Sequence, residues 1–136
     1  MRLLKSCTGQ GFKLTKDLDD DNIPQYAILS HTWGADEEEV TYTDIVNGTG
    51  RHKSGYKKLA FCAEQAGRDG QAYFWVDTCC IDKSNNVELN TAITSMFRWY
   101  AESTKCYVYL PDVSSTASLT GSDYSIPEQA EFRRSR

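Results

Sequence analysis

Short apolar runs alternate with stretches of helical periodicity along the chain. The runs at 26–30, 73–76 and 106–110 are rich in β-branched and aromatic residues, which favours buried strands. Between the first two runs, apolar positions recur at helical spacing over 54–69, and Gly70 follows as a typical helix stop. A second periodic stretch separates the last two runs. The predicted order is therefore strand, helix, strand, helix, strand.

The second predicted helix carries the clearest periodic pattern in the sequence. Asn85 is its expected N-cap, and Glu88 follows three residues later in a capping arrangement. Apolar positions spaced by three and four residues predict one buried stripe, which consists of Leu89, Ala92, Ile93, Met96, Phe97 and Tyr100. The predicted core of the whole domain contains Ala27, Ile28, Leu29, Phe74, Val76, Ile93, Met96, Phe97, Val108 and Tyr109.

Strands that are apolar throughout and alternate with helices are typical of a parallel sheet covered on both faces. The sequence therefore predicts an α/β fold with a flavodoxin-like arrangement of three layers. The segment Arg2–Leu4 is expected to add an N-terminal edge strand, with Phe12–Leu14 as its partner.

The composition places the chain among single globular domains. It has 136 residues, of which 40% are hydrophobic and 25% are charged. No apolar run approaches the roughly 18–20 residues that a membrane span needs, and the N-terminus lacks the apolar stretch of a signal peptide. The expected location is therefore the cytoplasm, with no membrane span.

The charge pattern argues against nucleic acid as the main partner. The net charge is −4, and the basic residues are scattered apart from a group at 133–136. Acidic residues cluster at 17–21 and 36–39, and we interpret both clusters as solvated loops. No metal site is predicted, because metal binding needs convergent ligands that these clusters do not establish.

The five cysteines do not form a recognisable framework. Their number is odd, no pair has the C-x-x-C spacing, and Cys79 is adjacent to Cys80. Without an export signal, we expect reduced thiols that mostly pack as small hydrophobic side chains.

Candidate functional residues follow the predicted strands, because parallel sheets bind ligands at the carboxyl ends of their strands. His31 and Asp77 are the catalytic candidates: imidazole is the acid or base that titrates near neutrality, and the carboxylate would hold its ring. The alternatives are a histidine that shapes its loop and an aspartate that caps the next turn. The ligand-binding candidates are Ser30, Trp33, Thr78 and Asp112.

Each of these side chains also has a structural interpretation. Trp33 suits stacking on a base or a sugar, or closing the edge of the core. Cys79 and Cys80 suit thiol catalysis with His31, but adjacent cysteines after a core strand more often serve packing. Glu88 is interpreted as a helix cap rather than a catalytic carboxylate.

The same segments resemble the heterokaryon incompatibility domain of fungi. The resemblance rests on the block 26–34 with Glu39-Val40 after it, and on the block 75–83 with its following helix. Segments 55–58 and 106–113 resemble the flanking elements of that domain. Members of the family trigger cell death, and the domain often precedes a nucleotide-binding, repeat-bearing receptor.

The family continues past this point with a block that contains a Gly-Trp pair and a Leu-Gln-Glu-Leu helix start. The resemblance therefore divides the chain into a heterokaryon incompatibility domain at 1–113 and a polar tail at 114–136, expected to be the truncated continuation of the same domain.

The family is distantly similar to Toll/interleukin-1-receptor (TIR) domains, some of which cleave NAD. Those enzymes use a glutamate on the helix after the third strand, which by this order lies in the block that would follow. The resemblance implies a TIR-like fold, NAD as a candidate substrate, and no certain cofactor.

Two main functions follow as expectations. The first is a cell-death effector that acts when clustered, through hydrolysis of the nicotinamide–ribose bond. The second is a non-enzymatic homotypic adaptor. Both imply self-association and partners of the nucleotide-binding receptor type, or domains of that type fused to this one.

Overall fold

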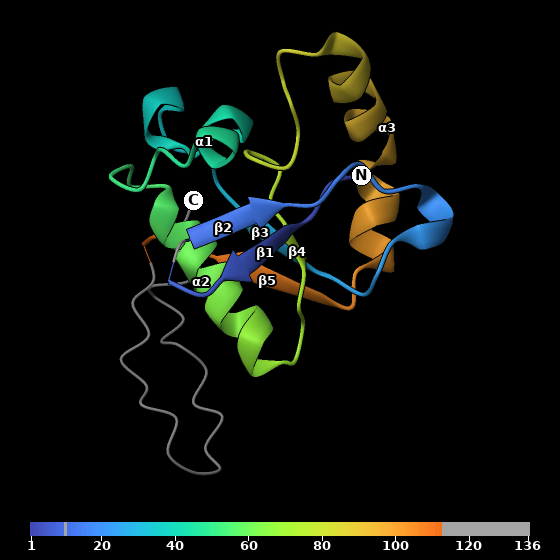
Figure 1. The fold of residues 1–136 in the computed structure, drawn as a ribbon, viewed down its shortest axis with the longest axis horizontal. Helices are drawn as coiled ribbons and strands as arrows, with labels where there is room; N and C mark the ends of the chain where they lie inside the picture. The colour runs from blue at the N-terminus through green and yellow to red at the C-terminus, as the bar shows by residue number, and fades with distance from the viewer. Residues whose placement is uncertain (10, 113–136) are drawn as a thin grey trace.

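The computed structural model describes residues 1–9 and 11–112, and it shows one five-stranded sheet with helices packed around it (Figure 1). The strands are β1 (Leu4–Cys7), β2 (Gly11–Leu14), β3 (Ala27–His31), β4 (Phe74–Trp75) and β5 (Lys105–Tyr109). The helices are α1 (Tyr42–Asn47), α2 (Tyr56–Arg68) and α3 (Asn86–Glu102), and short 3-10 turns cover Asp20–Asn22 and Asp36–Glu38. The predicted tail at 114–136 lies outside the described residues.

The sheet has the order β2-β1-β4-β3-β5, and its three later strands are parallel. This confirms the predicted α/β class. The prediction of an entirely parallel sheet is wrong, because β1 runs antiparallel to both β2 and β4. The short turn between Cys7 and Gly11 allows only an antiparallel hairpin, since a parallel connection needs a long crossover.

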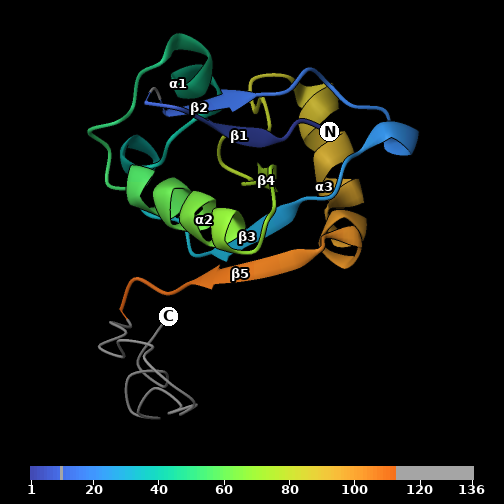
Figure 2. The ribbon, with the colours of Figure 1, turned by 60° about the horizontal axis from the view of Figure 1, so that its bottom comes forward.

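An N-terminal strand is present, but it covers Leu4–Cys7 rather than the predicted Arg2–Leu4, and it is not at the edge. Leu4 lies opposite Leu14 on one side and Phe74 on the other, so β2 forms the border of the sheet. Figure 2 shows α1 beside β2 at this border and β5 at the opposite one.

The two long helices begin and end near the predicted positions. The Asn85 side chain caps α3 by accepting hydrogen bonds from the backbone N–H groups of Val87 and Glu88, at 3.1 and 3.2 Å. Helix α2 ends at Arg68, and Gly70 follows in the left-handed conformation with φ +72°. Helix α1 was not predicted, although Thr41 and Asp44 form a complete capping box at its start.

The two long helices pack on opposite faces of the sheet. Phe74 contacts Phe12, which in turn contacts Tyr56 of α2. The next residue of β4, Trp75, packs edge to face against Trp99 of α3 at 5.6 Å between ring centres. Because successive side chains of a strand point to opposite faces, α2 and α3 lie on either side of β4.

The core prediction is confirmed for the strands and partly wrong for α3. Ala27, Ile28, Leu29, Phe74 and Val76 are buried, while Met96 and Tyr109 are half-buried against the core.

Ile93, Phe97 and Val108 are instead 60%, 86% and 57% exposed. The buried stripe of α3 is centred on Ala92 and Trp99, which turns Ile93 and Phe97 out of the core. Val108 lies on the border strand, where α3 does not cover it.

In the described part of the chain, no helix is long and apolar enough to cross a membrane.

Candidate functional site

A hydrogen-bonded cluster joins the ends of two neighbouring strands. His31 is the last residue of β3, and Asp77 follows β4 by two residues. Nε2 of His31 lies 2.9 Å from Oδ1 of Asp77, and the indole Nε1–H of Trp33 donates to Oδ2 at 2.9 Å. One carboxylate therefore holds both rings, because parallel strands bring their carboxyl ends to the same edge of the sheet.

Asp77 is largely buried and remains a carboxylate. Burial alone would raise its pKa, but its hydrogen bonds to His31 and Trp33 and the charge of Lys83 bring the pKa below its usual value. The Lys83 ammonium lies over the Trp33 ring, 4.4 Å from its centre. Three side chains thus converge on one ionised acid.

A cleft of about 390 Å³ opens beside this cluster. Its walls come from the segments after β3 and after β4, and most of its lining side chains carry hydroxyl or carboxylate groups. The lining consists of Trp33, Asp36, Glu39, Thr41, Tyr42, Thr43, Thr78, Ile81, Asp82, Lys83 and Ser84. The cleft is therefore suited to a ligand with several hydroxyl groups, and the exposed ring of Trp33 offers a flat surface.

The structure brings together some of the sequence-predicted site residues. His31, Trp33 and Asp77 are bonded to one another, and Thr78 lines the adjoining cleft. The buried Thr78 hydroxyl has no hydrogen-bond partner among the described residues.

Ser30 and Asp112 do not line this cleft. Ser30 precedes His31 in β3, so its side chain points to the opposite face of the sheet. Asp112 is exposed and follows β5 by three residues, and β3 separates β5 from β4. His31 and Asp77 adjoin the cleft through Trp33 and Thr78 but do not line it themselves. The prediction of one cleft around all the strand ends is therefore wrong, because Trp33 alone of the five residues predicted around it forms part of the lining.

The cleft contains residues that the sequence did not single out. Glu39 was assigned to a solvated acidic loop, yet it is only 7% exposed. It forms an ion pair with Lys58 of α2, which is 9% exposed. The available signal was the single lysine on the apolar side of α2, since a buried lysine requires a partner.

Glu88 does not form the predicted cap with Asn85, whose backbone N–H donates to the carbonyl oxygen of Asp82 instead. The Glu88 carboxylate pairs with Arg2 and accepts a hydrogen bond from the backbone N–H of Asp82 at 3.0 Å. Arg2 also lies over the ring of Tyr42, 5.0 Å from its centre. These contacts fix the segment after β4 against the N-terminus.

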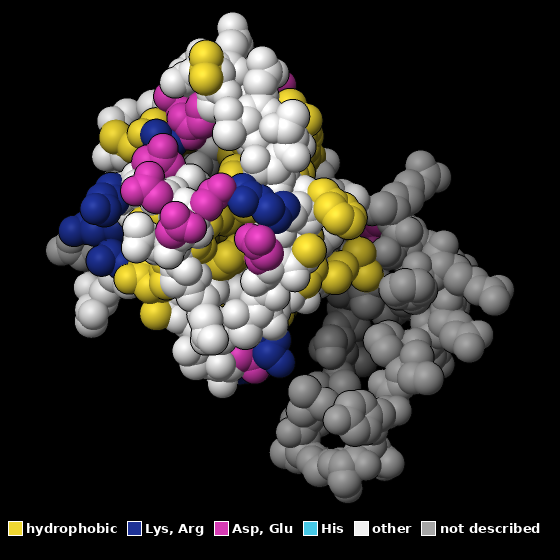
Figure 3. Space-filling model, turned by 90° about the vertical axis from the view of Figure 1, so that its right-hand side faces the viewer, with side chains coloured by type: hydrophobic (Ala, Val, Ile, Leu, Met, Phe, Trp, Pro, Cys, Tyr) yellow, Lys and Arg dark blue, Asp and Glu magenta, His cyan; other side chains and the backbone are white. Residues whose placement is uncertain are grey.

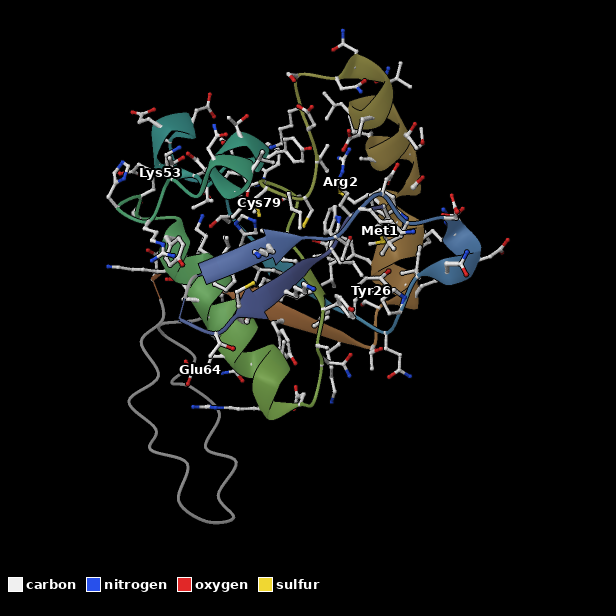
Figure 4. The ribbon with its side chains drawn as sticks, viewed as in Figure 1. Met1, Arg2, Tyr26, Lys53, Glu64 and Cys79 are labelled. Carbon is white, nitrogen blue, oxygen red and sulfur yellow. The ribbon has the colours of Figure 1, made fainter. Side chains whose placement is uncertain are left out.

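The cysteine thiols are not arranged for catalysis. All five cysteines are free, and Cys62, Cys79 and Cys80 are buried (Figure 4 labels Cys79). Burial raises the pKa of Cys79 well above its usual value, and it raises that of Cys62 to about 12. His31 bonds to Asp77 rather than to a thiol. These cysteines act as packing groups.

Metal ligation finds no support in residues 1–9 and 11–112. No three His, Cys, Asp or Glu side chains are grouped there in a way that could hold an ion.

Comparison with known proteins gives two matches. The family model described as heterokaryon incompatibility protein matches residues 26–135. Vegetative incompatibility protein HET-E-1 of Podospora anserina is 61% identical over 115 residues, which cover 85% of this chain and 8% of that protein. The chain thus spans a small part of its curated relative. The comparison with solved structures found no match.

Proposed function

Because the chain belongs to the heterokaryon incompatibility family, we propose that it is a cell-death effector domain of fungal vegetative incompatibility. The similarity to HET-E-1, a vegetative incompatibility protein, supports this role. In this proposal the domain acts in the cytoplasm, in a response that resembles innate immunity. Receptor-type partner proteins, or receptor domains fused to this one, activate it by clustering several copies.

The activity that we assign to the clustered domain is hydrolysis of the nicotinamide–ribose bond of NAD. The observation that carries it is the Asp77 carboxylate, bonded to His31 and Trp33 beside a hydroxyl-rich cleft. Water attacks the anomeric carbon of the ribose, and the bond to the nicotinamide nitrogen breaks. Nicotinamide leaves with the bonding electrons, and the proton of the attacking water is released.

The residues of the cleft have distinct roles in this scheme. In this proposal the Asp82 carboxylate, which lines the cleft as Thr78 does, accepts hydrogen bonds from the ribose hydroxyls. Positive charge develops on the ribose in the transition state, and fixed carboxylates nearby stabilise it. Asp77 and His31 are the catalytic candidates, and Trp33 provides the stacking surface. A TIR-like arrangement of the whole domain belongs to the same proposal.

The test is NAD consumption by the 136-residue chain and by a version extended through the family block expected to follow it, each fused to a drug-dependent dimerisation module. Chromatography would follow NAD and free nicotinamide before and after clustering. We expect nicotinamide release on clustering, with at least a tenfold loss in Asp77→Asn and His31→Ala. Asp112→Asn, a matched carboxylate outside the cleft, should behave like wild type. No release from either clustered wild-type version, or equal rates in all variants of the active version, would contradict the proposed chemistry.

A second function, homotypic interaction without catalysis, is favoured by one observation. Ile93, Phe97 and Val108 are exposed, large and apolar. Figure 3, which looks at the α3 side of the molecule, shows hydrophobic side chains gathered along one margin, apart from the charged groups. Cell-death assays separate the two functions. An adaptor would tolerate Asp77→Asn and lose activity in Phe97→Ser, whereas an enzyme requires Asp77.

A further inference from the structure

The backbone on either side of Trp33 is held by one buried ion pair. The Lys58 ammonium donates to the carbonyl oxygen of Thr32 at 2.8 Å, and the backbone N–H of Gly34 donates to Oε1 of Glu39 at 2.7 Å. Lys58 and Glu39 also bond to each other. The pair therefore brackets Trp33 through both of its neighbours in the chain.

Trp33 needs such support because its own side chain packs little. The residue is 63% exposed, and its side chain is held by the hydrogen bond to Asp77 and by the Lys83 ammonium over its ring. An exposed indole can take several rotamers, so the direction of its N–H depends on the backbone that carries it. If this backbone moved, the hydrogen bond to Asp77 would weaken.

The start of α2 is fitted closely to the same segment. The backbone N–H of Gly55 donates to the carbonyl oxygen of Glu38 at 2.8 Å. A Cβ atom at position 55 would lie 2.7 Å from that oxygen and 2.8 Å from Oε2 of Glu39, so the contact requires glycine. Helix α2 thus holds the segment 32–39 at several points, and Lys58 and Glu39 form the buried centre of this contact.

We propose that Lys58 and Glu39 are positioning residues for the Trp33–Asp77–His31 cluster. Among the described residues, neither forms a hydrogen bond with the His31 ring or the Asp77 carboxylate, and they act by fixing the backbone on both sides of Trp33. The importance of these two residues for catalysis rests on the proposed function. The geometric part, however, can be tested without any substrate.

The test uses the indole N–H resonance of Trp33 in two-dimensional proton–nitrogen spectra of the 136-residue chain, assigned with Trp33→Phe. Asp77→Asn defines the position of this resonance when the carboxylate is lost. We expect Lys58→Met to move it at least halfway toward that position, and Glu39→Gln to move it in the same direction by less. The matched control is Lys53→Met. Lys53, which is labelled in Figure 4, bonds to the Glu39 carbonyl oxygen and to Asp44, but to neither neighbour of Trp33.

Each outcome decides the proposal. A folded Lys58→Met with an unmoved Trp33 resonance overturns it, as does an equal shift in Lys53→Met. If Lys58→Met does not fold, Glu39→Gln decides alone, because the amide keeps the size of the side chain and one acceptor oxygen. Nicotinamide release is measured on the same samples. If neither the 136-residue chain nor the extended version cleaves NAD, the proposed function is refuted, while the resonance still decides the positioning role.

Discussion

Replacing Asp77 with asparagine tests the central cluster most directly. The asparagine has one acceptor oxygen where the carboxylate has two, and it carries no charge. The His31 ring is only 1% exposed, whereas the Trp33 indole can reach water. The remaining oxygen should therefore stay with His31, and Trp33 should lose its partner.

The magnitude follows from these two bonds. The hydrogen bond with His31 is no longer made by a charged group. The Trp33 indole N–H, which loses its carboxylate partner, bonds to water instead. Neutral hydrogen bonds contribute about 0.5–1.5 kcal/mol and bonds to charged groups about 1.5–3 kcal/mol, so Asp77→Asn should cost about 1–3 kcal/mol at pH 7. Urea unfolding, followed by circular dichroism, measures this difference.

The pH dependence gives a second readout with a definite sign. The pKa of Asp77 is lower in the folded state than its usual value, so its stabilisation is present above about pH 4 and is lost as the pH falls further. The difference in unfolding free energy between the wild type and Asp77→Asn should therefore shrink below about pH 4. A difference in unfolding free energy below about 0.5 kcal/mol at pH 7, or a difference that does not shrink in acid, would refute the reasoning. Asp112→Asn is the exposed control.

Two further predictions concern packing and thiol access. Ile93→Ala should cost less than about 1.5 kcal/mol, because Ile93 is largely exposed, whereas Leu59→Ala, at a fully buried position, should cost about 2–5 kcal/mol. Equal losses of unfolding free energy in the two variants, measured in urea, would contradict the exposed position of Ile93 on α3. In native protein, a maleimide reagent should label the exposed Cys106 well before Cys62 or Cys79, as intact mass would show. Early labelling of Cys79 would restore the thiol-catalysis interpretation.

The strands and the His31–Asp77 edge could be predicted because they depend on local pattern and on the geometry of parallel strands. The side of α3 that faces the core was harder to predict. The stripe through Ile93 and Phe97 is as regular as the one through Ala92 and Trp99, and only the sheet selects between them. Trp99 carried the missing information, because a large aromatic ring opposite Trp75 fixes which side faces inward.

The loop residues of the site could not be predicted by periodicity. Glu39 follows three exposed acidic residues, so its burial is visible only once Lys58 of α2 is placed against it. Likewise, nothing local distinguishes Asp112 from Asp77. The difference arises from strand order, which places β3 between β4 and β5.

The placement of the N-terminal hairpin has a consequence for the order of folding during synthesis. Leu4 pairs with Phe74, and Arg2 bonds to Glu88, which is 86 residues away in the chain. The hairpin therefore leaves the ribosome well before β4 and α3, and Leu3 and Leu4 stay without their buried surroundings until those elements emerge. Contacts between such distant residues slow folding. The sheet is thus completed late, and the hairpin is among the last elements to be buried although it is made before the elements that cover it.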